Sequence, residues 1–261
     1  MKTQRTGDLA RDPLAGDART ARTGTTGRWY RFLSWWVLLA GTAYLGLIVF
    51  FITLVQPAGR GGSLPQEYLE LTAATRDPGL YRLTIAFDVA AWLGMGGVLI
   101  AIAAVFFGRA PIRSTFIAAL GIGTLVGFFG ACLRLAGTTD LAARYLAATA
   151  THRVAELQSY LDLQQQINVS FSAGGLLIGL ALVLAASIAW RVSGFPRWVT
   201  VLLALAGVVG IVKAGIELTT GADLGPLGLL SATLLIISFP RLAGTFRRQV
   251  PAGGVANAPA S

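Results

Sequence analysis

The amino-acid sequence predicts an all-α protein: a polytopic transmembrane helical bundle with six spans and short helices in two extracytoplasmic loops. Apolar residues make up 54% of the 261 positions and charged residues only 13%, about half the charged share of a typical soluble domain. Long apolar segments follow one another along the chain, and lysines and arginines gather in alternate connections between them. A soluble core cannot bury that much apolar surface, whereas a helix bundle that faces lipid can.

The apolar segments define the expected spans, because crossing a bilayer takes roughly 20 helical residues. They run over Leu33–Val55, Thr84–Phe107, Thr115–Gly137, Ile167–Trp190, Trp198–Leu218 and Gly225–Pro240. The last is the shortest, since its pattern ends at a proline. Residues 1–28 and 249–261 contain few large apolar side chains, so we expect disordered cytoplasmic tails on either side of one membrane domain at 29–248.

The basic residues predict the orientation of the bundle. If the N-terminus is inside, the inside segments hold 14 of the 21 Lys and Arg residues and the outside segments hold five. Cytoplasmic loops carry the basic excess in membrane proteins, so both termini are expected in the cytoplasm. This topology signal accounts for the net charge of +9 without a nucleic-acid partner. The same arginines are expected to contact anionic lipids at the cytoplasmic face.

Two outside loops are long enough to hold structure of their own. In the first, Ser63 precedes Gln66 at the spacing of a capping box, which predicts a short helix through Thr75 and then a turn at Asp77–Gly79. In the second, apolar residues recur at helical spacing over Asp140–Gln166. We expect one or two amphipathic helices there, the last continuing into the fourth span.

Four charged residues lie within the expected spans, although a charge at the bilayer centre costs at least about 2.5–3.5 kcal/mol. They are Asp88, Arg134, Lys213 and Glu217, and their charges sum to zero. At 1.5 Å per residue all four lie within roughly 10 Å of the outer surface, in one polar layer. One interpretation is a site for a small ligand, an ion or protons. The other is an ion-pair network that fixes how the helices pack, with some side chains reaching the interface.

Glycines in two spans have the spacing that lets helices approach closely. They form the pairs Gly123-x-x-x-Gly127 and Gly175-x-x-x-Gly179. Packing within the bundle is the simpler use, and a homo-oligomer or partner membrane protein is the alternative. The single cysteine, Cys132, and the single histidine, His152, exclude most metal and haem sites. We therefore expect no metal and no cofactor.

The sequence contains no phosphate-binding loop, zinc-protease motif or serine-hydrolase motif, so no catalytic residue is assigned. This favours a non-enzymatic sensor, regulatory or accessory protein that acts through its outer loops and helix packing. A small-molecule or ion carrier using the polar layer is the first alternative. The second is an intramembrane enzyme using Lys213 together with Glu217 or Asp88, because burial can activate a lysine.

The chain resembles a bacterial family of uncharacterised integral membrane proteins, one of the domain-of-unknown-function groups. The resemblance rests on the six-span layout with long outer loops after spans one and three, and on three motifs, Ser172–Leu177, Gly194–Trp198 and Leu205–Val208. It covers most of Tyr30–Thr245. It implies a bacterial cytoplasmic membrane location and a six-helix fold, and the family offers no agreed activity or catalytic residues to transfer.

Overall fold

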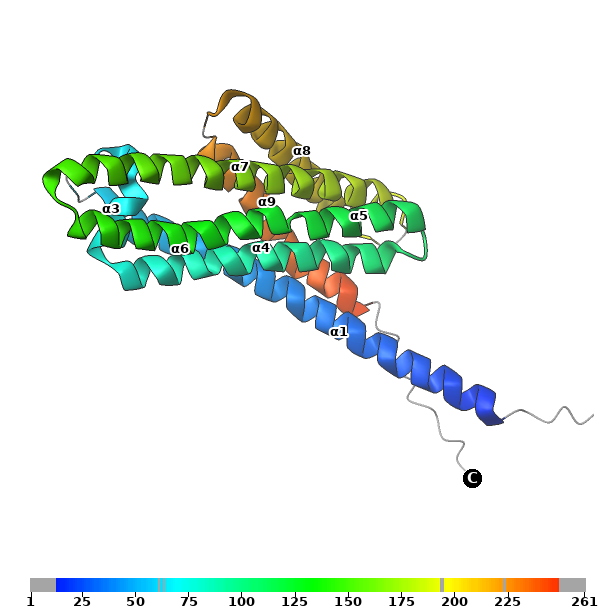
Figure 1. The fold of residues 1–261 in the computed structure, drawn as a ribbon. Coiled ribbons are helices and arrows are strands. Elements are labelled where there is room, and N and C mark those ends of the chain that lie inside the picture. Colours follow the sequence, from blue (N-terminus) through cyan, green and yellow to red (C-terminus); the bar gives the residue numbers. More distant parts are fainter. Residues whose placement is uncertain (1–12, 61, 63, 193–194, 223, 249–261) are drawn as a thin grey trace, which may run out of the picture.

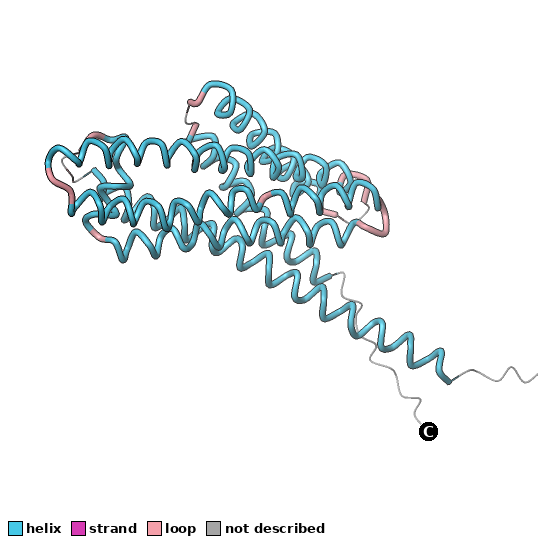
Figure 2. Tube along the Cα trace, viewed as in Figure 1, coloured by secondary structure: helices cyan, strands magenta, loops and turns pink. Residues whose placement is uncertain are grey.

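The computed structural model describes residues 13–60, 62, 64–192, 195–222 and 224–248, and throughout these residues the regular elements are helical (Figures 1 and 2). The α-helices are α1 (Pro13–Phe50), α2 (Gln56–Arg60), α3 (Leu69–Arg76), α4 (Pro78–Phe106), α5 (Pro111–Gly123), α6 (Leu125–Ala147), α7 (Ala150–Ala189), α8 (Arg197–Thr220) and α9 (Gly225–Arg248).

Six helical segments of the described chain are long and apolar enough to cross a membrane, which confirms the predicted all-α bundle. Two of these segments are composite. The first, Arg28–Arg60, contains the part of α1 from Arg28 onward, a π-helical stretch at Phe51–Val55 and α2. The third, Pro111–Ala147, contains α5 and α6 on either side of Thr124.

The outer surface of the bundle is apolar, as expected for helices that face lipid. Large side chains such as Leu39, Phe129 and Ile237 are 63%, 62% and 53% exposed. Soluble monomers rarely expose contiguous apolar surface of this kind. Large apolar side chains therefore cover the outside of the bundle as well as filling its interior.

The bundle has two distinct ends. The α3 end carries α2, α3 and the tight turn at Ala148–Thr149 between α6 and α7. The basic end carries the α4–α5 and α7–α8 turns and the C-terminus of α9, with Arg109, Arg113 and Arg191 among its exposed arginines. Figure 1 shows that α1 extends beyond the basic end and that α9 finishes beside α1 near that end, so the described chain starts and finishes on the same side.

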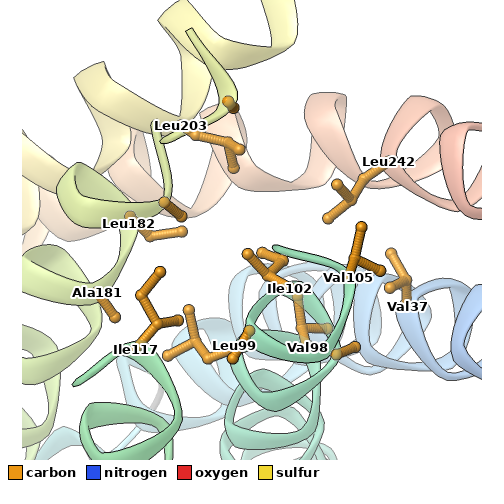
Figure 3. Close-up of a cluster of buried hydrophobic side chains, with 14 of the residues drawn as sticks. Val37, Val98, Leu99, Ile102, Val105, Ile117, Ala181, Leu182, Leu203 and Leu242 are labelled. Carbon is orange, nitrogen blue, oxygen red and sulfur yellow. The ribbon is translucent and has the colours of Figure 1, made fainter. Parts of the chain in front are cut away.

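An apolar core fills the half of the bundle near the basic end. Figure 3 shows side chains from α1, α4, α5, α7, α8 and α9 converging there. Val37, Leu99 and Ile117 are completely buried, and Ile102 and Leu203 are 1% exposed. This half of the protein is closed by close-packed aliphatic groups.

A second apolar cluster holds the loop helix α3 against the membrane helices. Leu71 and Ala74 of α3 are completely buried, and they belong to one cluster with Tyr81 of α4, Leu141 of α6 and Tyr160 of α7. Asp77 caps α4 by accepting a hydrogen bond from the Leu80 N–H at 2.9 Å, where a turn was predicted. The predicted capping residue Ser63 lies outside the described residues.

Several limits differ from those expected. The sixth span does not end at Pro240, because α9 continues to Arg248 with the proline inside it. A proline removes only one backbone donor, and a membrane helix tolerates that loss. In the second outer loop, the last helix continues into the fourth span as expected, because both belong to α7. The first part of Asp140–Gln166 is the end of α6 and not a separate helix. Helix α1 begins at Pro13, while residues 1–12 and 249–261 of the expected tails lie outside the described part.

Candidate functional site

The four charges predicted within the spans form two clusters near the α3 end. Asp88 of α4 and Arg134 of α6 are in one cluster. Lys213 and Glu217, one turn apart on α8, are in the other. Each charge therefore has an oppositely charged partner in the structure.

Arg134 is the centre of the first cluster and has two carboxylate partners. Its Nη1 donates to Asp88 Oδ2 at 2.9 Å. Its Nε donates to Glu70 Oε2 at 2.7 Å, and its Nη2 donates to Glu70 Oε1. The contact with Glu70 uses both oxygens of the carboxylate, which is the strongest arrangement for a guanidinium. Glu70 lies on α3, so this ion pair fastens the loop helix to the membrane helices.

The surroundings of Arg134 favour a desolvated, fixed guanidinium. Its side chain is 11% exposed, and those of Asp88 and Glu70 are 5% and 16% exposed. The Tyr81 hydroxyl donates to Glu70 Oε2 at 2.9 Å. The Phe51 and Phe171 rings lie 5.2 and 5.9 Å from the guanidinium carbon, within the range of cation–π attraction. Two carboxylates and one guanidinium leave this cluster with one excess negative charge.

The second cluster is local and fully neutralised. Lys213 Nζ donates to Glu217 Oε2, which also accepts from Ser172 Oγ of α7 at 2.7 Å. The other carboxylate oxygen accepts from the Leu224 N–H at 3.0 Å, just before α9 begins. Glu217 therefore joins α8 to α7 and to the α8–α9 turn. The Lys213 side chain is 23% exposed, and its partner Glu217 lies one turn further along the same helix.

A cavity of about 350 Å³ lies between the two clusters. Asp88 and Arg134 reach it from one side, and Lys213 and Ser172 reach it from the other. Most of the remaining wall is aromatic or aliphatic, from α1, α4, α7, α8 and α9; it includes Tyr44, Phe51, Trp92, Phe171, Ile178 and Leu235. A mainly apolar hollow with a few converging polar groups is the usual form of a small-molecule site.

An irregular stretch of the first membrane segment forms part of this wall. Phe51 and Ile52 line the cavity from the π-helical turn, in which the Gln56 N–H bonds to the Phe51 carbonyl. Pro57 follows directly. Its ring would clash with the carbonyl four residues earlier in a regular α-helix, and a wider turn relieves that clash. The proline thus explains why the helix wall is distorted beside the cavity.

The glycines predicted for packing differ in what surrounds them. A Cβ on Gly179 would lie 2.8 Å from the carbonyl oxygen of Gly207, and a Cβ on Gly207 would lie 2.8 Å from that of Gly179. Helices α7 and α8 therefore touch backbone to backbone at this crossing. Gly175 lines the cavity, and an added Cβ there has no heavy atom within 4 Å.

The other glycine pair faces side chains. A Cβ on Gly127 would overlap the Trp92 ring, and one on Gly123 would lie 2.9 Å from Leu177 Cδ1. The Trp92 ring, held in the space that Gly127 leaves, stacks on Phe171 with centroids 5.5 Å apart. A small residue in α6 therefore helps to set the aromatic wall of the cavity.

The two scarce residues lie away from the cavity lining. The His152 ring is exposed at the start of α7, with Nδ1 2.7 Å from Thr149 Oγ1. Cys132 is a half-buried free thiol. Within the described residues, no three His, Cys, Asp or Glu side chains lie close enough together to hold a metal ion.

Sequence reasoning missed Glu70, Tyr81 and Ser172, because it considered only charges inside apolar spans. Glu70 lies in a polar loop, and its role depends on how α3 folds back onto α6. The available signal was the predicted loop helix that follows the first span and approaches the outer end of the third. The polar layer and the loop helix were both predicted, but the ion pair between Arg134 and Glu70 that joins them was not.

Six apolar helices around these paired charges define a polytopic α-helical membrane protein. Within that class, the chain belongs to the family described as a domain of unknown function (DUF4386), which matches residues 39–246. This confirms the resemblance drawn from the sequence motifs. No curated protein and no solved structure matches the chain.

Proposed function

We propose that this protein binds a small amphipathic molecule, neutral or positively charged, in the cavity between the Arg134 and Lys213 clusters, and that it acts as a membrane sensor or regulatory protein. The observation that carries this proposal is the single cavity onto which both clusters open. A structural ion pair needs no adjoining hollow. Here about 350 Å³ of space separates the two clusters.

The charges around the cavity favour a neutral or cationic ligand. Asp88, Arg134 and Lys213 line the cavity. Glu70 and Glu217 lie behind the two cations as their ion-pair partners. Over the two clusters together, three carboxylates therefore face two cations. Arg134 already has two carboxylate partners, so it offers little to a ligand anion. Aromatic side chains on the wall attract cations through their ring faces. A lipophilic cation fits both features better than an anion of the same size.

A sensor fits the geometry better than the other two classes. The half of the bundle near the basic end is packed with the aliphatic core, so a ligand passing from the cavity to that end would have to displace these side chains (Figure 3). An enzyme using Lys213 would need a free amine lone pair, whereas this ammonium donates to Glu217. Binding without transport or chemistry is the simplest use of such a site.

A pair of probe ions tests the proposal, because tetraphenylphosphonium and tetraphenylborate have similar shapes and opposite charges. Binding is measured by equilibrium dialysis on purified protein in nanodiscs. We expect the cation to bind at least about tenfold more tightly than the anion, a difference of about 1.4 kcal/mol. Equal affinities, or tighter binding of the anion, would contradict the charge argument.

Gly175→Leu is the matched structural test, because it fills the cavity from a position with no neighbour within 4 Å. The control is Gly244→Leu in α9, which also has open space around the added carbon and is not among the residues that line the cavity. We expect loss of cation binding in the first variant and unchanged binding in the second. Unchanged binding in Gly175→Leu would show that the cation binds outside this cavity.

A flux assay separates a sensor from a carrier. Proteoliposomes loaded with the labelled cation should retain it at the rate of protein-free vesicles. Release that the Gly175→Leu variant abolishes would instead establish the carrier.

We further propose that the protein lies in a bacterial cytoplasmic membrane with both termini inside and the α3 end outside. The basic residues of the short loops support this orientation. In a Cys132→Ser background, a cysteine at Thr149 should react with a membrane-impermeant maleimide in intact cells, and one at Thr245 should react only after lysis. The reverse pattern would invert the topology.

A further inference from the structure

We propose that a groove at the basic end binds the phosphate of an anionic membrane lipid. The groove lies between the start of α5 and the end of α7 and has a volume of about 390 Å³. Arg109 and Arg113 line it from the α4–α5 side, and Arg191 lines it from the α7–α8 turn. Three guanidinium groups from two separate turns therefore border one hollow.

No acidic side chain of the described residues neutralises these arginines. The ion pairs of the described chain all belong to the α3 end and involve Arg134, Arg144 and Lys213. Every acidic residue whose side chain the structure describes lies in the sequence between Glu67 and Glu217 and in space on the α3 side of the bundle. Arginine forms two parallel hydrogen bonds with phosphate oxygens, so an anion with several oxygens suits this cluster.

The backbone adds donors at the same place. Helix α5 starts at Pro111 inside the groove, and its N-cap residue Ala110 provides no side-chain hydrogen bond. The first turn of α5 also contains no acidic residue. The first N–H groups of a helix lack internal partners and attract anions.

The rest of the groove is apolar, which favours a lipid over a free anion. Ile188 and Val192 belong to its wall, and Ile112 on its rim is 73% exposed. Phe107 and Trp190, from the same two turns, are 56% and 58% exposed. Exposed aromatic residues mark the level of the headgroups in membrane proteins. A phosphate held by the arginines would thus have its acyl chains beside apolar side chains.

Native mass spectrometry of the purified protein tests this site. The probes are dioleoylphosphatidylglycerol and dioleoylphosphatidylcholine, which have the same acyl chains and differ in headgroup charge. The variant is the triple change Arg109→Gln, Arg113→Gln and Arg191→Gln. Its control changes Arg197, Arg241 and Arg248 to Gln, which removes the same charge from exposed positions of the same end outside the groove.

We expect the groove variant to bind the anionic lipid about tenfold more weakly and the control variant to bind it as the native protein does. Equal losses in both variants would mean that only the total charge of this end matters, which would overturn the proposal. Displacement of the lipid by millimolar inorganic phosphate would also overturn it, in favour of a soluble anion.

A single exposed change, Arg191→Gln, covers the case in which the triple variant does not fold. It should weaken binding of the anionic lipid severalfold and leave phosphatidylcholine binding unchanged. Unchanged binding of the anionic lipid would remove Arg191 from the site and contradict the proposal.

Discussion

The Arg134 and Lys213 clusters contain the same chemistry in two different arrangements. Arg134 joins residues 64 and 46 positions away, on a loop helix and on another membrane helix. Lys213 joins a residue four positions away on its own helix. The first cluster therefore holds tertiary structure together, while the lysine of the second supports a carboxylate that has other partners.

Because the two clusters differ in this way, removing Arg134 and removing Lys213 leave their carboxylate partners in different situations. Without Arg134, Glu70 and Asp88 lose their shared cation inside a desolvated site. Without Lys213, Glu217 still accepts from Ser172 and from the Leu224 N–H. A buried charge stripped of its partner is far more costly than one that keeps hydrogen bonds.

The largest expected effect is that of Arg134→Met. It leaves the carboxylates of Glu70 and Asp88 without a cation in a desolvated site and should lower the free energy of unfolding by about 3–5 kcal/mol. Thermal unfolding in detergent, followed by loss of the monodisperse species, measures the change. The triple variant Arg134→Met, Glu70→Gln and Asp88→Asn should recover most of the stability. No recovery would mean that the arginine acts mainly through packing.

Arg134→Lys should have a smaller effect, because the charge stays and the fork of donors is lost. A single ammonium cannot hold both oxygens of Glu70 and one of Asp88 in the observed geometry. We expect a loss of about 2 kcal/mol, measured by the same unfolding assay. Native-like stability would show that charge alone holds α3.

Lys213→Met should cost about 1.5 kcal/mol, one charged hydrogen bond. The side chain of Glu217 is 9% exposed and keeps its two other donors. Adding Glu217→Gln to the Lys213→Met variant should then restore the lost free energy of unfolding. A loss as large as that of Arg134→Met would erase the distinction between the clusters.

Tyr81→Phe should have the smallest effect, about 1 kcal/mol for one hydrogen bond. Its hydroxyl bonds to Glu70, and the ring is 1% exposed, so packing is retained. Hydrogen exchange of the Leu69–Arg76 amides should become faster, while that of α8 should not change. Equal acceleration in both helices would indicate global rather than local loosening.

The fold was predictable because burial in lipid leaves a simple signal: about 20 apolar residues for each span. Segment limits were less predictable, as Pro240 shows. A proline in a soluble helix commonly ends it, but here neighbouring helices support the turn. The sequence also gave no sign that Thr124 separates α5 from α6, a break at which the Thr124 hydroxyl bonds to the Gly121 carbonyl at 2.6 Å.

The polar layer was predictable in depth and not in pairing. Counting residues from the end of a span gives the height of a charge, and says nothing about which way its helix is turned. Asp88 and Arg134 could therefore be placed near one level, but their bond to each other could not be inferred. The contact of Glu70 with Arg134 could not be predicted in this way, because it depends on the packing of α3 against the bundle through the buried side chains of Leu71 and Ala74.

The close crossing at Gly179 and Gly207 divides α8 into two parts of unequal length. Lys213 lies six residues from Gly207, about 9 Å along the helix axis, and Arg197 lies ten residues away on the other side, about 15 Å. No side chain separates the two backbones at the crossing, so α7 and α8 are in contact there over a short stretch. If α8 turned as a rigid body about this crossing, Arg197 would move further than Lys213 because it lies further from the crossing. Val199 and Leu203, which are buried in the apolar core, would then have to repack, so a change at the cavity would be felt in the core near the basic end.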